Sequence, residues 1–441
     1  MRLNCLTTIL SCLPAFYALA QKQDLRFDHF GTNNGLSQSN VSCILQDSRG
    51  FMWFGTRDGL NRYDSYTFTV YRNIDGDSSS IGSNYINKII EDASGTIWVA
   101  TNGGGISSYS RIKNNFKNYR HNNEDAASIS SNYVNCVFAD SHGNIWAGTD
   151  GGGLDEFDSA TGKFKHYTSK PGVANSIGDN FIRSIHEDRL HNLWIGTINH
   201  GLDMFDPVRK IFTHYQHDYK DPSSISNNDV YFMYEDGRGR TWVGTNGGGL
   251  NLFNRQKGTF THFENDPRNP NSLPANSLYD ILEDKKGNLW LGTENGGLSI
   301  FNPASGTFTN YVHDDIDAQS LGNNSIYAIC RDTRGDIWLG TFNAGVDVIN
   351  ADKRNFAYYR HSTNANSLSS NKVLCIYEDS KTNVWVGTDG GGLNMLDPHT
   401  DRFTHFTHQT GNANSICGNY VLHVMEDDKH NLWIGTWADG L

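Results

Sequence analysis

The chain has 441 residues, of which 12% are aromatic, 19% are charged and 45 are glycine, a composition typical of a β-rich globular protein with many turns. Its formal net charge of -12 argues against a nucleic-acid partner, because nucleic-acid binding requires a basic face. After the N-terminal segment, no apolar run reaches the roughly 18 residues needed to span a membrane.

Residues 1–20 predict a secretory signal peptide. Arg2 precedes an apolar run over 6–19, and Ala18-Leu19-Ala20 forms a small-x-small cleavage sequence. An alternative interpretation as a lipoprotein, through Cys12, is weaker because apolar residues continue beyond the cysteine. We therefore expect an exported, periplasmic protein.

The first predicted strand of the exported part is Phe27-Asp28-His29-Phe30. Its pattern matches residues 260–263 and 403–406, each of which ends a later repeat unit as its fourth strand. This first copy stands before any complete unit. We therefore expect residues 26–30 to complete the last sheet of a closed ring and to cover its edge.

One unit then recurs nine times, and each copy reads as four short strands rich in Ile, Val, Tyr, Phe and Trp, bounded by Gly, Asn and Asp. Every unit carries a Trp, 45 to 48 residues from the next, with an Asp six residues before it. The Trp residues are Trp53, Trp98, Trp146, Trp194, Trp242, Trp290, Trp338, Trp385 and Trp433. The Asp residues are Asp47, Asp92, Asp140, Asp188, Asp236, Asp284, Asp332, Asp379 and Asp427. Four strands per repeat and a period in the forties predict a β-propeller.

The predicted fold is all-β, with a seven-bladed propeller of four-stranded antiparallel blades over residues 21–352. Residues 353–441 predict the first blades of a second propeller, which the sequence truncates. The sequence stops at Gly440-Leu441, where a third strand is due, and a sheet cut there would leave backbone groups unpaired. We therefore expect a fragment of a longer protein.

The repeated residues predict structural roles. The Trp can fill the space between neighbouring sheets, and the Asp can accept hydrogen bonds from turn amides. Nine equivalent Asp residues make a poor catalytic site, because chemistry needs one site, so we expect no catalytic residue. The triple glycines predict turns with positive φ rather than a phosphate-binding loop; they are residues 103–105, 151–153 and 247–249.

Three further repeated positions are also expected to be structural. In the loops before each unit, Ser-Ile or Ser-Leu is followed by Asn, which predicts an apolar plug and an Asn that bonds backbone; examples are Ile177, Ile225 and Leu273, with Asn180, Asn228 and Asn276. Histidines recur on predicted outer strands, where equivalent positions diverge and metal ligation is not expected; they are His166, His214, His262 and His405. Cysteines at one equivalent position predict small buried side chains without disulfides; they are Cys43, Cys136 and Cys375.

Units such as residues 287–302, with Leu289-Trp290-Leu291-Gly292-Thr293, resemble the two-component regulator propeller repeat. The opening stretch 27–64 is similar to the N-terminus of a hybrid two-component sensor, and the resemblance covers residues 24–441. It implies two periplasmic propellers followed by a β-sandwich, a membrane helix, a histidine kinase, a receiver and a DNA-binding region, none of which is in this sequence. It also implies glycan fragments as ligands, and membrane attachment and a homodimer through the missing parts.

Units that break the glycine turn between their second and third strands are candidates for ligand contacts. In a seven-bladed ring the first and seventh units adjoin, so we expect Arg57 and Asp58 near Phe342 and Asn343. An aromatic face with fixed polar groups suits a sugar. The full set of candidate ligand residues is Arg57, Asp58, Asn199, His200, Glu294, Asn295, Phe342 and Asn343. The alternative is ordinary loop variation, or contact with the second propeller.

The sequence thus predicts a ligand-sensing region that takes an oligosaccharide or another small extracellular ligand and needs no cofactor or metal. One alternative is an exported scaffold or adhesin. Another is a carbohydrate-active propeller enzyme, which is disfavoured because no paired carboxylates or Arg cluster stand out from the repeats.

Overall fold

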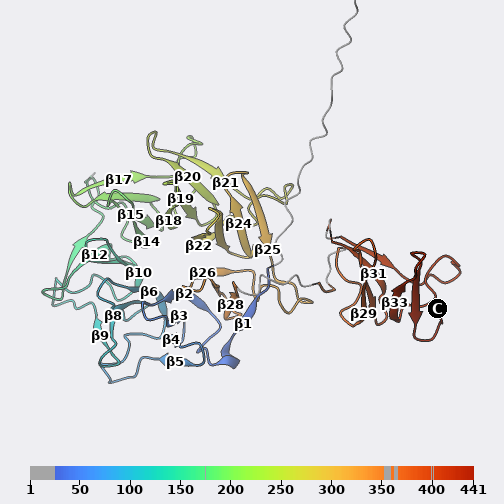
Figure 1. Cartoon of the computed structure of the whole chain (residues 1–441). Coiled ribbons are helices and arrows are strands. Elements are labelled where there is room, and N and C mark those ends of the chain that lie inside the picture. Colours follow the sequence, from blue (N-terminus) through green and yellow to red (C-terminus); the bar gives the residue numbers. More distant parts are fainter. Residues whose placement is uncertain (1–24, 174, 352–358, 362–365, 399, 401) are drawn as a thin grey trace, which may run out of the picture.

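The computed structural model describes residues 25–173, 175–351, 359–361, 366–398, 400 and 402–441 (Figure 1). The predicted signal peptide, 1–20, lies outside these residues. Seven four-stranded antiparallel sheets, called blades 1 to 7, surround a centre, as Figure 1 shows. The all-β, seven-bladed fold predicted from the repeat is therefore confirmed.

Blades 1 to 6 each use four consecutive strands, the first of them innermost. Blade 1 contains β2 (Val41–Gln46), β3 (Met52–Thr56), β4 (Gly59–Tyr63) and β5 (Phe68–Tyr71); blade 2 contains β6 (Ile86–Glu91), β7 (Ile97–Thr101), β8 (Gly105–Ser110) and β9 (Asn115–Tyr119); blade 3 contains β10 (Val134–Ala139), β11 (Ile145–Thr149), β12 (Leu154–Asp158) and β13 (Lys163–Tyr167). Blade 4 contains β14 (Ile182–Glu187), β15 (Leu193–Thr197), β16 (Leu202–Asp206) and β17 (Ile211–Tyr215); blade 5 contains β18 (Val230–Glu235), β19 (Thr241–Thr245), β20 (Leu250–Asn254) and β21 (Thr259–Phe263); blade 6 contains β22 (Leu278–Glu283), β23 (Leu289–Thr293), β24 (Leu298–Asn302) and β25 (Thr307–Tyr311).

Blade 7 joins the two ends of the ring. It contains β26 (Ile326–Arg331), β27 (Ile337–Thr341), β28 (Val346–Ile349) and, from the N-terminal side, β1 (Asp28–Phe30). β1 pairs antiparallel with β28, which places His29 opposite Asp347. The inner strand β26 packs beside β2, just as the inner strands of the other neighbouring blades pack beside each other. The ring is thus closed by sequence from both ends, and a single 3-10 turn, η1 (Thr32–Asn34), follows β1.

The C-terminal part repeats the same element. One four-stranded sheet contains β29 (Val373–Glu378), β30 (Val384–Thr388), β31 (Gly392–Asp397) and β32 (Arg402–Phe406). A two-stranded sheet follows, with β33 (Val421–Glu426) and β34 (Leu432–Thr436). In the described part of the chain, no helix has the length and hydropathy needed to cross a bilayer.

The repeated Asp and Trp behave as predicted, and they also contact each other. The carboxylate of Asp236 accepts hydrogen bonds from the amides of Arg238 and Arg240, both at 2.9 Å, which holds the turn between β18 and β19. Its other oxygen accepts the indole N–H of Trp242 at 2.9 Å, and Trp242 is 1% exposed in the core between blades 5 and 6. The same Trp–Asp bond recurs in all nine units, at 2.7 to 3.3 Å.

The other repeated positions are structural too. Ile177, Ile225 and Leu273 are fully buried. The Asn side chains beyond them accept backbone amides at 2.7 to 2.8 Å, as predicted; they are Asn180, Asn228 and Asn276. The five described cysteines are free; Cys43 and Cys136 are buried, as expected, whereas Cys375 is only partly buried. The four repeated histidines lie on outer strands, β13, β17, β21 and β32.

Candidate ligand site at the channel mouth

The centre of the ring is a channel of about 650 Å³. Its lining comes from the innermost strand of each of the seven blades, which are β2, β6, β10, β14, β18, β22 and β26. The first residue of each inner strand is fully buried in the blade, and the second residue lines the channel. These seven second residues are Ser42, Asn87, Asn135, Arg183, Tyr231, Tyr279 and Tyr327.

The chemistry of this layer differs between the two sides of the ring. Blades 1 to 3 contribute small polar side chains, whereas blades 5 to 7 contribute three consecutive tyrosines. The rings of Tyr231 and Tyr279 lie 4.7 Å apart at 88°, and those of Tyr279 and Tyr327 lie 4.5 Å apart at 75°. Phe342 continues the series, 5.7 Å from Tyr327 at 73°. These edge-to-face contacts hold four rings as one continuous surface, called here the aromatic arc.

An arginine lies at each end of the aromatic arc. The Cζ atom of Arg183 is 4.5 Å from the ring centroid of Tyr231. At the other end, the Cζ atom of Arg57 is 6.0 Å from the centroid of Phe342 and 5.2 Å from that of Tyr85. Such cation–π contacts restrict long, flexible side chains to one orientation. The arc is therefore positioned before any ligand arrives.

Hydrogen bonds fix the Arg183 end from behind. Both Nε and Nη2 of Arg183 donate to the carboxylate of Asp229 at 3.2 Å. Asn246 donates to the same carboxylate at 3.0 Å, and the hydroxyl of Ser277 donates to Asn246 at 2.8 Å. This chain of polar groups connects blades 4, 5 and 6 beside the tyrosines.

The tyrosine hydroxyls stay neutral. Burial raises the pKa of Tyr279, and the neighbouring Tyr231, Tyr327 and Glu294 raise it further. Burial also raises the pKa of Tyr231, although the charge of Arg183 opposes it. A neutral phenol can both donate and accept a hydrogen bond, which is the capacity needed to bind a hydroxylated ligand.

Next along the inner strands lie two charged residues, Lys88 on β6 and Asp280 on β22. The carboxylate of Asp280 accepts the amides of Ile281 at 2.9 Å and of Ile329, in blade 7, at 2.7 Å. Burial raises the pKa of Asp280, with the charge of Lys88 opposing the shift. Lys88 itself is exposed to the channel, so it offers a cation to a ligand.

The structure brings together only part of the set predicted from sequence. Arg57 and Phe342 meet as ring closure predicts, and Glu294 adjoins Tyr279. Asp58 instead pairs with Arg72 at 2.9 Å.

The two predicted asparagines of blades 6 and 7 are used in loop contacts. The backbone N–H of Asn295 donates to the hydroxyl of Ser325 at 3.1 Å. The side-chain oxygen of Asn343 accepts a hydrogen bond from the side chain of Asn323 at 2.7 Å.

The two predicted residues of blade 4 are not among those that line the channel. Asn199 donates to Asp179 through its backbone and its side chain, at 3.1 and 3.3 Å. The ring of His200 lies 5.6 Å from that of His214, at 87°. Both residues therefore belong to the loop packing of their own blade.

Sequence reasoning missed most of the aromatic arc. The sequence does contain a signal for three of its residues. In three successive units, a tyrosine follows the first apolar residue of the inner strand; these are Tyr231, Tyr279 and Tyr327. In all seven blades this second residue lines the channel, at the β-bulge between the first and third residues of the strand.

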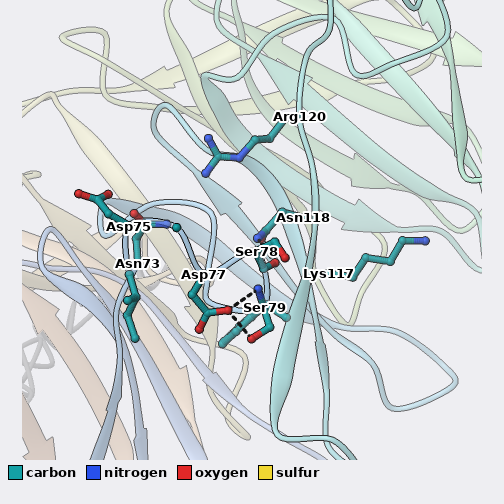
Figure 2. A pocket seen from close by; sticks show the side chains of 11 residues that line it. Asn73, Asp75, Asp77, Ser78, Ser79, Lys117, Asn118 and Arg120 are labelled. Carbon is teal, nitrogen blue, oxygen red and sulfur yellow. Dashed lines mark hydrogen bonds between the residues drawn. The ribbon is translucent and has the colours of Figure 1, made fainter.

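A second hollow, of about 740 Å³, lies over the loop between β5 and β6 (Figure 2). Its polar side chains are largely committed to the loop. Asp77 accepts the amide and hydroxyl of Ser79 at 2.9 and 2.6 Å, and Arg120 donates to the carbonyl of Gly82 at 2.6 Å. It lacks the aromatic surface of the channel, so the channel mouth is the better candidate.

Comparison with known proteins gives the family. The family model described as two component regulator propeller matches nine segments, which are 35–58, 80–103, 128–151, 176–199, 224–247, 272–295, 320–343, 367–390 and 415–438. Histidine kinase P4 of Formosa agariphila is 47% identical over 75 residues, which make up 17% of this chain and 6% of that protein.

Solved structures show the same fold. The extracellular domain assigned to the hybrid two-component system BT3049 of B. thetaiotaomicron has a TM-score of 0.69 at 24% identity, covering 95% of this chain and 65% of that one. The corresponding domain of BT4673 from the same organism has a TM-score of 0.60 at 23% identity, covering 95% and 58%. The chain thus spans less than two thirds of the length of these relatives.

Proposed function

Because the chain belongs to the two-component regulator propeller family, we propose that it is the ligand-sensing region of an extracytoplasmic two-component sensor, and that the aromatic arc binds an oligosaccharide fragment. Among its structural neighbours are extracellular domains of two-component systems. The proposal includes a signal peptide at 1–20, a first propeller over 21–352 and the start of a second over 353–441. Periplasmic location, a downstream membrane helix with a kinase, and a homodimer formed through those parts belong to the same proposal.

The aromatic arc is the observation that carries the ligand class. Sugars present C–H faces that stack on aromatic rings, and hydroxyls that bond to amides and phenols. The channel offers rings from Tyr231 to Phe342 on one side. On the other side, Ser42, Asn87 and Asn135 donate to carbonyls of the next blade at 2.6 to 2.9 Å, which leaves their side-chain oxygens as acceptors. A concave, largely preformed site with few convergent polar groups is what a small ligand needs.

Titration calorimetry of the 441-residue chain with a panel of neutral and acidic oligosaccharides tests the site. A ligand that binds the wild type should bind Tyr279→Ala at least about 30-fold more weakly, as expected for a residue that contributes 2 kcal/mol or more at the centre of a site. Tyr66→Ala is the control, since Tyr66 is 89% exposed in the β4–β5 turn, away from the inner strands. Equal loss in both variants, or no loss in Tyr279→Ala, would contradict the assignment.

Signalling requires that the ligand bind two arrangements of the sensor with different affinity, because equal affinity shifts no equilibrium. The coding sequence beyond Leu441 tests the sensor half of the proposal separately. A membrane helix followed by a kinase supports it, whereas an early stop leaves a ligand-binding propeller without a signalling partner.

A further inference from the structure

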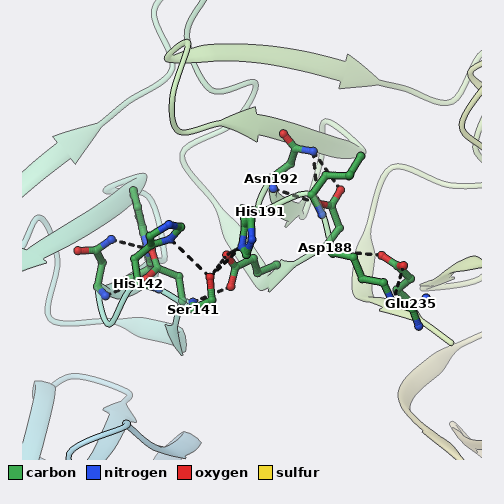
Figure 3. Close-up of polar contacts among 12 residues, drawn as sticks. Ser141, His142, Asp188, His191, Asn192 and Glu235 are labelled. Carbon is green, nitrogen blue, oxygen red and sulfur yellow. Dashed lines mark hydrogen bonds and ion pairs between the residues drawn. The ribbon is translucent and has the colours of Figure 1, made fainter. Parts of the chain in front are cut away.

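The turns between the first and second strands of blades 3 and 4 bring two histidines and a glutamate together. They are His142 in the β10–β11 turn, Glu187 at the end of β14 and His191 in the β14–β15 turn. One ligand atom from each lies within 4.8 Å of the others. Figure 3 shows Ser141, His142 and His191 turned toward one another from these two adjacent turns. The group is at the opposite end of β14 from Arg183, so it is separate from the channel mouth.

Glu187 is held in place by Ser141, which lies outside the three candidate ligands, and by the candidate ligand His191. The amide and the hydroxyl of Ser141 both donate to its carboxylate at 2.7 Å. The ring nitrogen Nδ1 of His191 lies 3.0 Å from the same carboxylate. Glu187 is largely buried, whereas His142 and His191 are exposed. One fixed carboxylate with two adjustable imidazoles is a suitable start for a metal site, in which supporting hydrogen bonds orient the ligands.

His191 occupies its turn at a conformational cost. Its φ is +64°, in the left-handed region that favours glycine. Six other units place glycine at this position, namely Gly50, Gly95, Gly143, Gly239, Gly287 and Gly335. The other two units have Thr382 and His430 there, so the conformation by itself does not mark a metal site.

The C-terminal part provides an internal comparison, because three of the four residues recur there. Ser380 donates to Glu426 at 2.7 Å, and Nδ1 of His430 lies 2.7 Å from the same carboxylate. The residue equivalent to His142 is Lys381, whose ammonium has no lone pair and would repel a cation. The Ser–Glu–His arrangement alone is therefore explained as a link between neighbouring sheets. What distinguishes the turns of blades 3 and 4 is His142, which supplies a third candidate ligand.

We propose that His142, Glu187 and His191 bind a divalent transition-metal ion, for which zinc is the best match. Two imidazoles and one carboxylate are ligands that zinc accepts, leaving a fourth position for water. Zinc bonds to nitrogen and oxygen are about 2.0–2.2 Å long, so modest rotation of the two exposed imidazoles would close the present spacing. The ion would join blades 3 and 4 on the face away from the channel mouth.

The test is zinc titration of the 441-residue chain without a histidine tag, by calorimetry and by competition with a chromophoric chelator. Two variants copy residues that other units already carry in the same turns, so they should fold. His142→Lys reproduces Lys381, and His191→Gly reproduces Gly143. Each should lower zinc affinity by about 100-fold or more, since even loss of a supporting group costs 10–100-fold. Ser141→Ala, which reproduces Ala93, removes a positioning residue and should lower it by about 10-fold.

His430→Gly is the matched control, because it removes the equivalent histidine from a site that lacks the third ligand. It should leave zinc binding unchanged. Zinc should also raise the melting temperature of the wild type in a concentration-dependent manner, and should not do so in His142→Lys. Three results would overturn the proposal: no zinc binding by the wild type at millimolar concentration, unchanged binding in both His142→Lys and His191→Gly, or an equal loss in His430→Gly. Unchanged binding would assign any zinc to another group, such as His200, Asp203 and His214.

Discussion

The closed ring and the C-terminal part are built from the same repeat, but they bury it to different extents. Trp242, in the ring, is 1% exposed, and Trp385, which the β33–β34 sheet covers, is 9% exposed. Trp433, in the last described sheet, is 47% exposed. Yet Trp433 donates to Asp427 at 3.0 Å, much as Trp242 donates to Asp236. The local sequence therefore forms the turn and its Trp–Asp bond, whereas the next blade buries the ring.

The largest difference should appear when the indole is removed. Trp242→Ala leaves a cavity between blades 5 and 6 and should lower the free energy of unfolding by about 3–5 kcal/mol. Trp433→Ala removes a side chain that is half in solvent, so its cost should be less than half as large. Urea unfolding followed by hydrogen exchange, which separates the two parts of the chain, measures both costs. Equal costs would mean that Trp433 is covered in solution.

A smaller contrast should follow when the carboxylate is changed. Asp236→Asn places an amide donor or a weaker acceptor against the buried indole N–H of Trp242, and should cost about 1–3 kcal/mol. Asp427→Asn should cost less, because water can reach Trp433. The same hydrogen-exchange measurement compares the two variants.

Acid provides a check on this contrast. Burial opposes ionisation of Asp236, but bonds from Trp242 and Arg240 outweigh it and lower its pKa. Its contribution is therefore present above the unfolded pKa, near about 3.9, and is lost as pH falls through the lower folded value. The Asp236→Asn variant should lose stability less steeply in acid than the wild type does, and an equal slope would contradict the role of this carboxylate.

The same division between local and long-range effects decides what sequence could predict. Repeat period, strand pattern and turn residues are local, so the propeller and the roles of Trp242 and Asp236 followed from them. The contact of Arg57 with Phe342 followed from ring closure. The pairing of Tyr231 with Tyr279 and the approach of His142 to His191 depend on how adjacent blades lie. Such contacts join residues one repeat apart. The recurrence of Tyr231 and Tyr279 at one position of successive units is a signal for the first contact, whereas no local pattern marks the second.

The turns themselves differ between the two parts. The ring uses glycine at the left-handed turn position except at His191, whereas the C-terminal part has Thr382 and His430 there, at φ +68° and +63°. Thr382→Gly removes a β-branched residue from this conformation and should raise stability by about 0.5–1 kcal/mol, after allowance for the freer unfolded chain. At Gly50 an added Cβ meets no neighbouring atom within 4 Å, so the reverse change, Gly50→Thr, should cost a similar amount through φ. Thermal unfolding compares the pair, and opposite signs are required.

The smallest effect should distinguish the strand that closes the ring. His29 on β1 lies 2.6 Å from Asp347 on β28, and this hydrogen bond raises the pKa of His29, with burial opposing it. Stability from the pair is therefore fully present below the unfolded pKa, near about 6.5, and is lost as pH rises through the raised folded value.

Hydrogen exchange of β1 and β28, corrected for the intrinsic rate, should thus show weaker protection at pH 8.5 than at pH 6, by less than about 1 kcal/mol because His29 is partly exposed. His29→Gln should remove this pH dependence. The C-terminal part provides the comparison, since His405 faces Asn394 rather than a carboxylate. His166 and Asp155 form the same pair between β12 and β13. These two strands are consecutive in the chain and form a hairpin, so the hairpin connection keeps β13 in place when the hydrogen bond is lost. β1, by contrast, is held in blade 7 by its pairing with β28 rather than by a hairpin connection. Weaker protection at high pH in β1 but not in β13 would show that the His–Asp hydrogen bond stabilises the closure of the ring.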